Sequence, residues 1–222
     1  MIRGVVTDLE GTTTSITFVH DVLFPYASRE LDAFVRERGR EPEVARCLDE
    51  LAALGRAEDL LPDPVAVARA FMAADRKVTP LKRLQGLIWE AGYANGALIA
   101  DVYPDVAPRL TAWRAAGRRI AVFSSGSVHA QKLLLGHTTA GDLRPLVDAW
   151  FDTEVGSKIE ASSYVAIARS LALPPAELLF LSDSRGELIA ARAAGWMAIG
   201  LARDGALPAA EGPWARTFDT VD

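Results

Sequence analysis

The chain has 222 residues, of which 50% are hydrophobic and 24% charged, a balance typical of a globular protein with a sizeable core. Its 24 basic and 29 acidic residues give a net charge of -5, which argues mildly against nucleic acid and anionic membrane as partners, because binding to a nucleic-acid phosphate backbone normally shows a clustered basic surface. The length favours one domain with a large insertion over two full domains.

The single cysteine, Cys47, rules out an internal disulfide and is compatible with a reducing compartment. It lies in a charged, helix-like stretch without a His or Cys partner at metal-ligand spacing, so we expect a buried or half-buried thiol. No stretch approaches the roughly 18 apolar residues of a membrane span, and no basic region followed by a long apolar run stands near the N-terminus. We therefore expect a cytoplasmic protein with no membrane partner, and we expect it to be a monomer.

The first predicted element is a β-prone run, residues 2–7, which stops at Asp8. Gly11 and the three threonines after it break the pattern, so this buried strand delivers its carboxyl end to a loop. From residue 15 to 97 the apolar residues recur at helical spacing, most clearly over 80–91. We expect residues 15–97 to form an all-helical insertion.

Strands and helices alternate from residue 98 to 222. The predicted strands are 120–123, a short one near Phe151, 178–181 and 197–201, and the predicted helices are 105–116, 130–135, 162–171 and 187–194. Asp105 can cap the first of these helices. The alternation implies right-handed crossovers and an α/β fold with a Rossmann-like parallel sheet covered on both faces, built from residues 1–14 and 98–222.

Three of the predicted strands end in polar clusters. The clusters are Asp8 to Thr12, Ser124 to Ser127, and Ser182-Asp183 with Glu187. In an open parallel sheet, ligands bind outside the carboxyl ends of the strands, where the strand order reverses. We expect the clusters to converge on one crevice, with Lys158 contributed by a connecting segment.

The carboxylates of this set suit magnesium. Asp8, Glu10, Asp183 and Glu187 are the acidic residues of the clusters. They offer hard oxygen ligands, and Mg²⁺ prefers one or two carboxylates together with water and substrate phosphate. Clustered carboxylates would also repel one another without a cation. We therefore expect one Mg²⁺ per chain.

The other members of the set suit a phosphoryl group. Ser124, Ser125 and Gly126 can offer hydroxyls and backbone N–H groups, and Lys158 supplies a positive charge. A carboxylate such as Asp8 is a recognised nucleophile toward phosphorus and forms an aspartyl-phosphate. The set predicts a phosphatase that acts through positioning and electrostatic stabilisation.

Each of these residues alone also has a structural explanation. Asp8 could cap a turn, Asp183 could be an N-cap, and Glu187 could favour the first turn of its helix. Lys158 could lie on the surface. The functional hypothesis depends on the whole set occurring in order at strand ends. The histidines show no ligand spacing: His20, His129 and His137.

The same clusters resemble the four motifs of the haloacid dehalogenase-like superfamily. A more specific resemblance, to the enolase-phosphatase E1 family of methionine salvage, runs nearly end to end and is weakest over residues 36–78. It is carried by residues 7–14, 22–26, 124–128, 130–133, 141–143 and 151–153, and by Lys158 and Ser163-Tyr164. The opening is the most specific part, because most of the superfamily has a second aspartate where this chain has Glu10.

The resemblance implies a role for each matched position. Asp8 would be the nucleophile and a Mg²⁺ ligand, and Glu10 would occupy the general acid/base and metal-contacting position. Asp183 would complete the metal site. Lys158 would hold the phosphate and Asp8, and Ser124 and Ser125 would bind the phosphate.

The family acts on a small phosphorylated diketone, 2,3-diketo-5-methylthiopentyl-1-phosphate, which it enolises and then dephosphorylates to an acireductone. By this resemblance the helical insertion would be a cap that selects substrate and excludes water. Two positions depart from the family pattern. Leu9 replaces a common isoleucine without consequence, and the polar run 184–186 leaves the placement of Glu187 open.

Other functions remain as alternatives. A carbon–halide hydrolase of the same fold would need Asp8 but no metal, and Glu10 and Asp183 argue against it. A phospho-accepting regulatory module uses similar residues but is shorter and lacks an insertion. A phosphatase of the same fold acting on another small metabolite, and a non-catalytic relative, are further alternatives. The enolising base is either Glu10 or His20, whose structural role would be packing near Phe24 and Tyr26.

Overall fold

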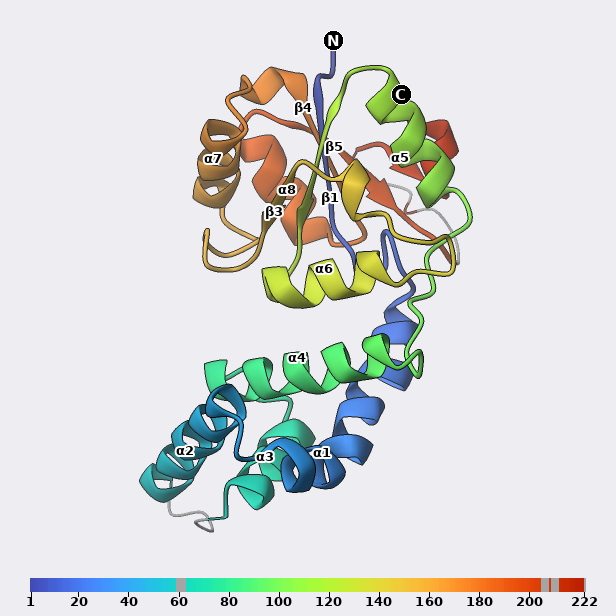
Figure 1. The fold of residues 1–222 in the computed structure, drawn as a ribbon. Coiled ribbons are helices and arrows are strands. Elements are labelled where there is room, and N and C mark those ends of the chain that lie inside the picture. Colours follow the sequence, from blue (N-terminus) through green and yellow to red (C-terminus); the bar gives the residue numbers. More distant parts are fainter. Residues whose placement is uncertain (59–62, 205–207, 209–211, 222) are drawn as a thin grey trace. The chain divides into compact units, whose positions relative to one another are not determined.

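The computed structural model describes residues 1–58, 63–204, 208 and 212–221, and it divides into two compact units (Figure 1). Unit 1 contains Met1–Phe18 and Ile99–Asp222, and unit 2 contains Val19–Leu98. The divisions fall at 18/19 and 98/99, where the sequence suggested 14/15 and 97/98. The role of unit 2 as a cap stays a prediction.

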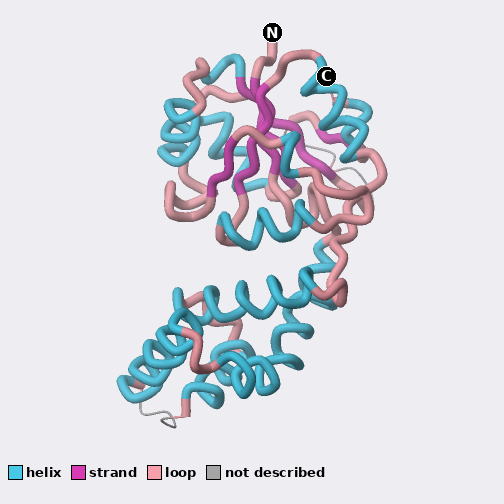
Figure 2. The backbone as a smooth tube through the Cα atoms, viewed as in Figure 1, coloured by secondary structure: helices cyan, strands magenta, loops and turns pink. Residues whose placement is uncertain are grey.

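Unit 1 is built on a parallel sheet with the strand order β3-β2-β1-β4-β5-β6 (Figure 2). The strands are β1 Gly4–Thr7, β2 Arg119–Phe123, β3 Ala149–Phe151, β4 Leu178–Ser182, β5 Met197–Leu201 and β6 Trp214–Ala215. All neighbouring pairs are parallel. The predicted α/β class and parallel sheet are confirmed. The sequence did not indicate β6, because two residues are too few to show a strand pattern.

Helices cover the sheet on both faces, α7 and α8 on one and α5 on the other (Figure 1). The helices of unit 1 are α5 Val106–Ala115, α6 Val128–Gly136, α7 Ala161–Ser170 and α8 Arg185–Ala193, with the 3₁₀ turns η2 Arg144–Leu146, η3 Pro175–Glu177 and η4 Phe218–Thr220. On the first face, Tyr164 of α7 lies edge-on to the rings of Phe123, Phe180 and Trp196, with centroids 5.6, 5.1 and 5.5 Å away. These aromatic contacts fix α7 against the sheet.

The prediction that Asp105 caps α5 is wrong. Asp105 is the residue before the helix, but its side chain makes no capping hydrogen bond. Its Oδ2 instead accepts from the backbone N–H of Phe218 at 2.6 Å and from Arg203 Nη1 at 2.7 Å. A distant charged partner therefore outcompetes the local capping interaction.

The described residues of unit 2 form helices: a π-helical turn η1 Phe18–Leu23, which begins at the last residue of unit 1, then α1 Phe24–Arg38, α2 Pro42–Ala57, α3 Pro64–Ala73 and α4 Thr79–Ala94. Each α-helix has a proline in its first two residues, and in α2, α3 and α4, which follow extended residues, the missing N–H costs nothing. Asp63 also caps α3 by accepting from two backbone N–H groups. Within this unit Cys47 is fully buried, as expected.

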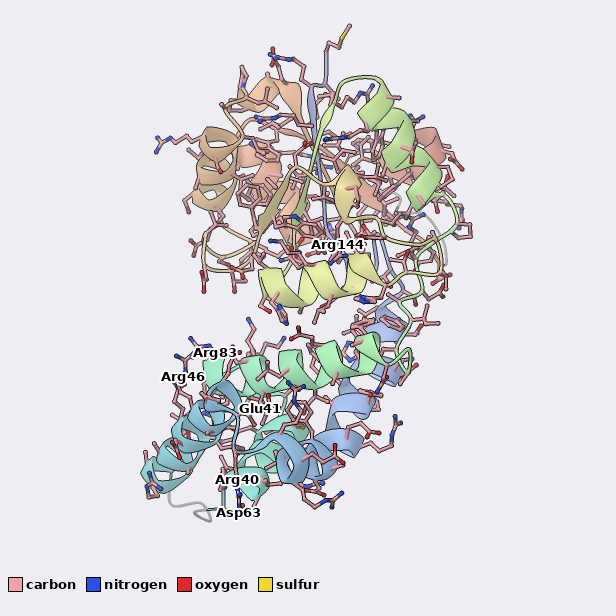
Figure 3. All side chains as sticks on the ribbon, in the orientation of Figure 1. Arg40, Glu41, Arg46, Asp63, Arg83 and Arg144 are labelled. Carbon is pink, nitrogen blue, oxygen red and sulfur yellow. The ribbon has the colours of Figure 1, made fainter. Side chains whose placement is uncertain are left out.

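Charged side chains cover the outside of unit 2 (Figure 3). Arg46 of α2 and Arg83 of α4 both approach Glu50, at 3.8 and 3.6 Å, and all three side chains are exposed. Exposed ion pairs of this kind contribute little stability. In the part of the chain that the structure describes, none of the helices is long and apolar enough to cross a membrane.

Candidate active site

The strand ends that carry the polar clusters meet at one edge of the sheet. β1 lies between β2 and β4, and its last residue, Thr7, is paired with Val122 on one side and Leu181 on the other. Asp8 therefore leaves the sheet between the segments that begin at Ser124 and Ser182. This is the convergence expected for the carboxyl edge of a parallel sheet.

Asp8 is held rigidly at the end of β1. Its side chain is 6% exposed, and its Oδ1 accepts from the N–H of Leu9 at 2.7 Å. Its backbone carbonyl accepts from the hydroxyls of Thr7 and Thr13 at 2.9 and 2.6 Å. These threonines were not predicted to have a role. The run of threonines after Gly11 was the available signal, since hydroxyls are suited to bonding a nearby backbone carbonyl.

Lys158 faces Asp8. Its Nζ lies 2.8 Å from Asp8 Oδ1 and 2.8 Å from Glu187 Oε2, and its side chain is 7% exposed. Burial acts to lower the pKa of Lys158, but the charges of Asp8 and Glu187 more than offset it and the pKa is raised. Lys158 is therefore a fixed positive charge beside the Asp8 carboxylate and not a surface lysine.

Glu187 lies in the first turn of α8 and is buried. Its Oε2 contacts Lys158 and accepts from the hydroxyl of Ser182 at 2.8 Å. Burial, and then the negative charge of Asp8, raise the pKa of Glu187. The sequence left its placement open, and the structure makes it the second carboxylate partner of Lys158.

Asp183 lies close to the Asp8 loop. A Cβ added to Gly11 would meet Asp183 Oδ2 at 2.1 Å, so the absence of a side chain at Gly11 makes room for this carboxylate. Asp183 is the one exposed residue among the four carboxylates, yet the groups packed around its carboxylate reduce its hydration. That loss and the charge of Asp8 raise its pKa to about 6. Asp183 does not cap α8; the residue at that position is Ser184.

A cation fits the donors at this place. Asp8 and Asp183 are two carboxylates that repel each other, which is the donor set that Mg²⁺ accepts when water and phosphate complete its coordination. Among the described residues, no three His, Cys, Asp or Glu side chains gather closely enough to hold a metal alone. Glu10 is half-buried, and its backbone pairs with Thr14. Its part as a ligand stays a prediction.

The segment after β2 forms a turn held by its own hydrogen bonds, and its part in binding phosphate stays a prediction. Ser124 is buried and its Oγ accepts from the N–H of Gly126 at 3.2 Å. A Cβ added to Gly126 would meet only Ser124 Oγ, at 3.7 Å, so the backbone faces open space there. Gln131 of α6 donates to the carbonyls of Gly126 and Phe151, both at 2.8 Å. Ser125 is exposed on the same turn. Gln131 was not predicted to be a support of this turn.

Two side chains from α7 hold the segment that carries Lys158. Ser163 Oγ donates to the carbonyl of Ser157 at 2.7 Å, and the Tyr164 hydroxyl donates to the carbonyl of Lys158 at 2.8 Å. Burial raises the pKa of Tyr164, so the hydroxyl keeps its proton and remains a donor. The sequence offered Ser163-Tyr164 only as part of a resemblance.

Two of the three histidines contact residues close to them in the sequence. The ring of His20 lies 6.2 Å from that of Phe24 within unit 2. His137 Nδ1 lies 2.9 Å from the carbonyl of Leu133, four residues earlier.

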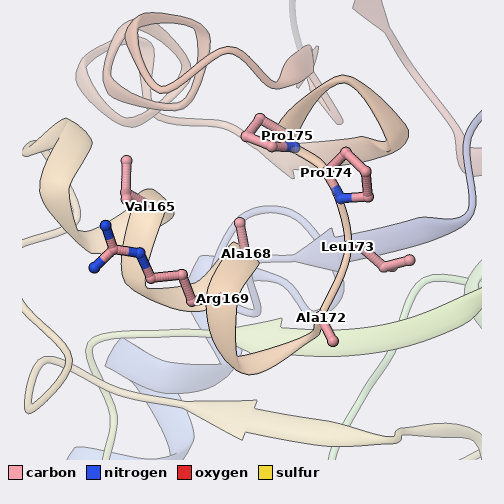
Figure 4. Close-up of a pocket in the computed structure, with 7 residues that line it drawn as sticks. All are labelled: Val165, Ala168, Arg169, Ala172, Leu173, Pro174 and Pro175. Carbon is pink, nitrogen blue, oxygen red and sulfur yellow. The ribbon is translucent and has the colours of Figure 1, made fainter.

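A separate hollow of about 350 Å³ lies beside α7 and is mostly apolar (Figure 4). It is lined by Val165, Ala168, Arg169, Ala172, Leu173, Pro174 and Pro175, none of which belongs to the site.

Known proteins are similar to this chain in sequence. A model of the haloacid dehalogenase-like hydrolase family matches residues 2–195. The chain is 50% identical over its full length to enolase-phosphatase E1 of Pectobacterium carotovorum subsp. carotovorum, covering 97% of that protein. It is also 50% identical over its full length to enolase-phosphatase E1 of Methylococcus capsulatus, covering 98%.

Solved structures agree with these matches. The UTR4 protein of Saccharomyces cerevisiae is similar over 100% of both chains, with a TM-score of 0.84 and 30% identity. CbbY of Rhodobacter sphaeroides in complex with phosphate, at 21% identity and a TM-score of 0.64, covers 100% of this chain and 96% of that one and shares the fold. The chain belongs to the haloacid dehalogenase-like hydrolase family and, within it, to the enolase-phosphatase E1 family.

Proposed function

We propose that this chain enolises 2,3-diketo-5-methylthiopentyl-1-phosphate and then removes its phosphate to give the acireductone. The observation that carries the proposal is the buried Asp8 carboxylate, which lies 2.8 Å from the Lys158 ammonium at the carboxyl edge of the sheet. The 50% identity to enolase-phosphatase E1 relatives over the whole chain supports the choice of substrate. Unit 2 acts as the cap, and the chain works as a monomer.

Dephosphorylation proceeds in two displacements at phosphorus. An Asp8 oxygen attacks phosphorus and the bond from phosphorus to the substrate oxygen breaks, while Glu10 gives a proton to the departing oxygen. Water then attacks the aspartyl-phosphate and gives its proton to Glu10. Inorganic phosphate leaves, and the Asp8 carboxylate and the Glu10 proton are restored.

The other site residues bind and neutralise the phosphoryl group. Lys158 places its positive charge beside Asp8, where negative charge accumulates on the phosphoryl oxygens during transfer. Ser124, Ser125 and Gly126 receive the remaining phosphoryl oxygens through hydroxyls and backbone N–H groups. Glu187 fixes Lys158 from its other side.

Asp8 and Asp183, with Glu10 beside them, would hold a Mg²⁺. When bound, this ion supplies positive charge that neutralises the carboxylates and polarises substrate oxygens. The donor set suits this ion, because its two carboxylates lie close enough for Asp8 to raise the pKa of Asp183.

Enolisation needs a base that removes a proton from the carbon beside a carbonyl. Glu10 is the candidate in unit 1, and His20, which is exposed, is the candidate in unit 2. Time courses of enol absorbance with Glu10→Gln and His20→Ala decide between them. A folded His20→Ala protein that enolises normally leaves the histidine with a structural role only.

The experiment that tests the function supplies the diketo phosphate to the purified protein and follows enol absorbance and free phosphate together. The proposal expects the enol to appear first and phosphate to follow in equal amount. Phosphate release from this substrate without an enol phase would favour a simple phosphatase of the same fold acting on another small metabolite. Release of halide from a haloacid in the presence of a chelator would favour the carbon–halide hydrolase.

A further inference from the structure

A buried arginine lies beside the loop that carries Asp8. Arg203 follows the end of β5 by two residues, at the same carboxyl edge of the sheet as the site, and its side chain is 4% exposed. Its Nε and Nη2 both donate to the carbonyl of Thr12, at 2.8 and 2.6 Å. Two donors from one planar group on a single carbonyl fix both the position and the direction of that peptide.

The rest of the guanidinium is equally constrained. Nη1 lies 2.7 Å from Asp105 Oδ2 and 3.2 Å from the carbonyl of Arg216. The guanidinium carbon lies 4.3 Å from the ring centroid of Tyr103 and 4.7 Å from that of Phe218. Arginine suits such a place because its flat, delocalised charge stacks on aromatic rings while its edge donates hydrogen bonds. A lysine has a single compact ammonium and cannot make the same set of contacts.

The loop carries this constraint to the nucleophile. Thr12 is joined to Thr13, whose hydroxyl donates to the carbonyl of Asp8 at 2.6 Å. Thr13 and Thr14 are also held by residues 101–103. The N–H of Tyr103 donates to the carbonyl of Thr13 at 3.2 Å, and the Thr14 hydroxyl donates to the carbonyl of Asp101. A shift of the Thr12 peptide would therefore move the hydroxyl that fixes the Asp8 backbone.

We propose that Arg203 is a positioning residue for the Asp8 loop and thereby sets the rate of the step at phosphorus. The inference rests on the proposed function, in which Asp8 is the nucleophile. Burying a guanidinium has a desolvation cost. Apolar side chains would hold the C-terminal segment, residues 216–221, against the rest of unit 1 at least as well. What the arginine adds is a fixed direction for the Thr12 carbonyl, which apolar packing cannot supply.

The test compares Arg203→Lys with Arg109→Lys. Arg109 is also a stacked arginine that reaches the C-terminal segment: its guanidinium lies 5.4 Å from the ring centroid of Trp113 on its own helix, and its Nη2 donates to the carbonyl of Val221. Both variants lose a stacked arginine and a contact to the C-terminal segment, but Arg203→Lys alone also loses the fork on Thr12. Folding is checked by circular dichroism and thermal melting, and kcat and KM for the diketo phosphate are measured on each.

The proposal expects Arg203→Lys to lower kcat by about 10- to 100-fold with KM changed by less than about twofold, since a displacement of about 1 Å at the reacting group costs about that much. Arg109→Lys is expected to keep the wild-type kcat, even if its melting temperature falls by as much as that of Arg203→Lys. A wild-type kcat in Arg203→Lys, or equal losses of kcat in both variants, overturns the inference.

Asp105→Asn decides the question where Arg203→Lys does not fold. It weakens the anchor that orients the Arg203 guanidinium and so loosens the fork on Thr12, and the proposal therefore expects a smaller fall in kcat with KM unchanged. A folded Asp105→Asn protein with wild-type kcat also overturns it. If the wild-type protein itself releases no phosphate from this substrate, the proposed function has failed, and the result is distinct from a failure of the role of Arg203.

Discussion

Replacing Gly11 by alanine tests whether the position of the Asp183 carboxylate beside the Asp8 loop matters for the reaction. Two effects follow from the structure. Gly11 has φ +69°, a left-handed conformation that costs a residue with a Cβ roughly 1–2 kcal/mol. The new Cβ would also lie 2.1 Å from Asp183 Oδ2, whereas Cβ atoms stay at least 3.0 Å from other heavy atoms, so the carboxylate must retreat by about 0.9 Å.

The two effects differ in what they change. An aspartate carboxylate is the end of a flexible side chain and can move at little cost in stability, but a displacement of about 1 Å at a reacting centre costs about 100-fold in rate. We therefore expect Gly11→Ala to lower kcat by about 100-fold. The backbone cost alone would lower the melting temperature by about 2–8 °C, and the lower entropy of the unfolded chain reduces that fall.

Gly117→Ala is the matched control. Gly117 has φ +76°, and a Cβ added there meets nothing within 4 Å. It therefore carries the same backbone cost without the overlap, and we expect a similar fall in melting temperature with wild-type kcat. The assay is phosphate release from the diketo phosphate over a range of Mg²⁺ concentrations, with melting curves for all three proteins. A Gly11→Ala protein with the kcat and Mg²⁺ requirement of Gly117→Ala would refute the reasoning.

The structure supports three further predictions. Tyr164→Phe removes the donor to the Lys158 carbonyl and leaves that buried group unpaired, which costs about 1–3 kcal/mol in urea unfolding and lowers kcat; wild-type values of both would contradict this. A chelator abolishes phosphate release and Mg²⁺ restores it, but Ca²⁺ does not, because its looser coordination misplaces the phosphoryl group; full activity in chelator would favour the metal-free hydrolase. Burial raises the pKa of the Cys47 thiol and so lowers its thiolate fraction, so a thiol reagent at pH 7 labels it only after unfolding in denaturant; rapid labelling of the native protein would show that the thiol is accessible.

Strand ends with their polar clusters could be read from the sequence because they depend on short local patterns. The run 2–7 is β-prone and stops at Asp8, and the strand indeed ends at Thr7. The parallel order follows from the alternation of helices and strands. For this reason the fold class and the convergence of Asp8, Ser124 and Asp183 needed no knowledge of distant contacts.

Residues that act through distant partners could not be read in the same way. Arg203 meets Thr12, 191 positions away along the chain, and neither residue has a local pattern that points to the other. Asp105 looks like a helix cap, and only the fold reveals a partner that competes for its carboxylate. Glu187 fits a helix first turn equally well, and its contact with Lys158 depends on how α8 meets the segment before α7.

The central claim is that Asp8 attacks phosphorus in a step separate from enolisation. Asp8→Asn keeps the size of the side chain and removes the nucleophile, so it tests that claim directly. In a folded Asp8→Asn protein that still binds Mg²⁺, a time course with the diketo phosphate should show the enol accumulating while no phosphate is released. Phosphate release at near the wild-type rate would contradict the account, and a folded, Mg²⁺-binding protein that formed no enol would show that the two steps are not separable.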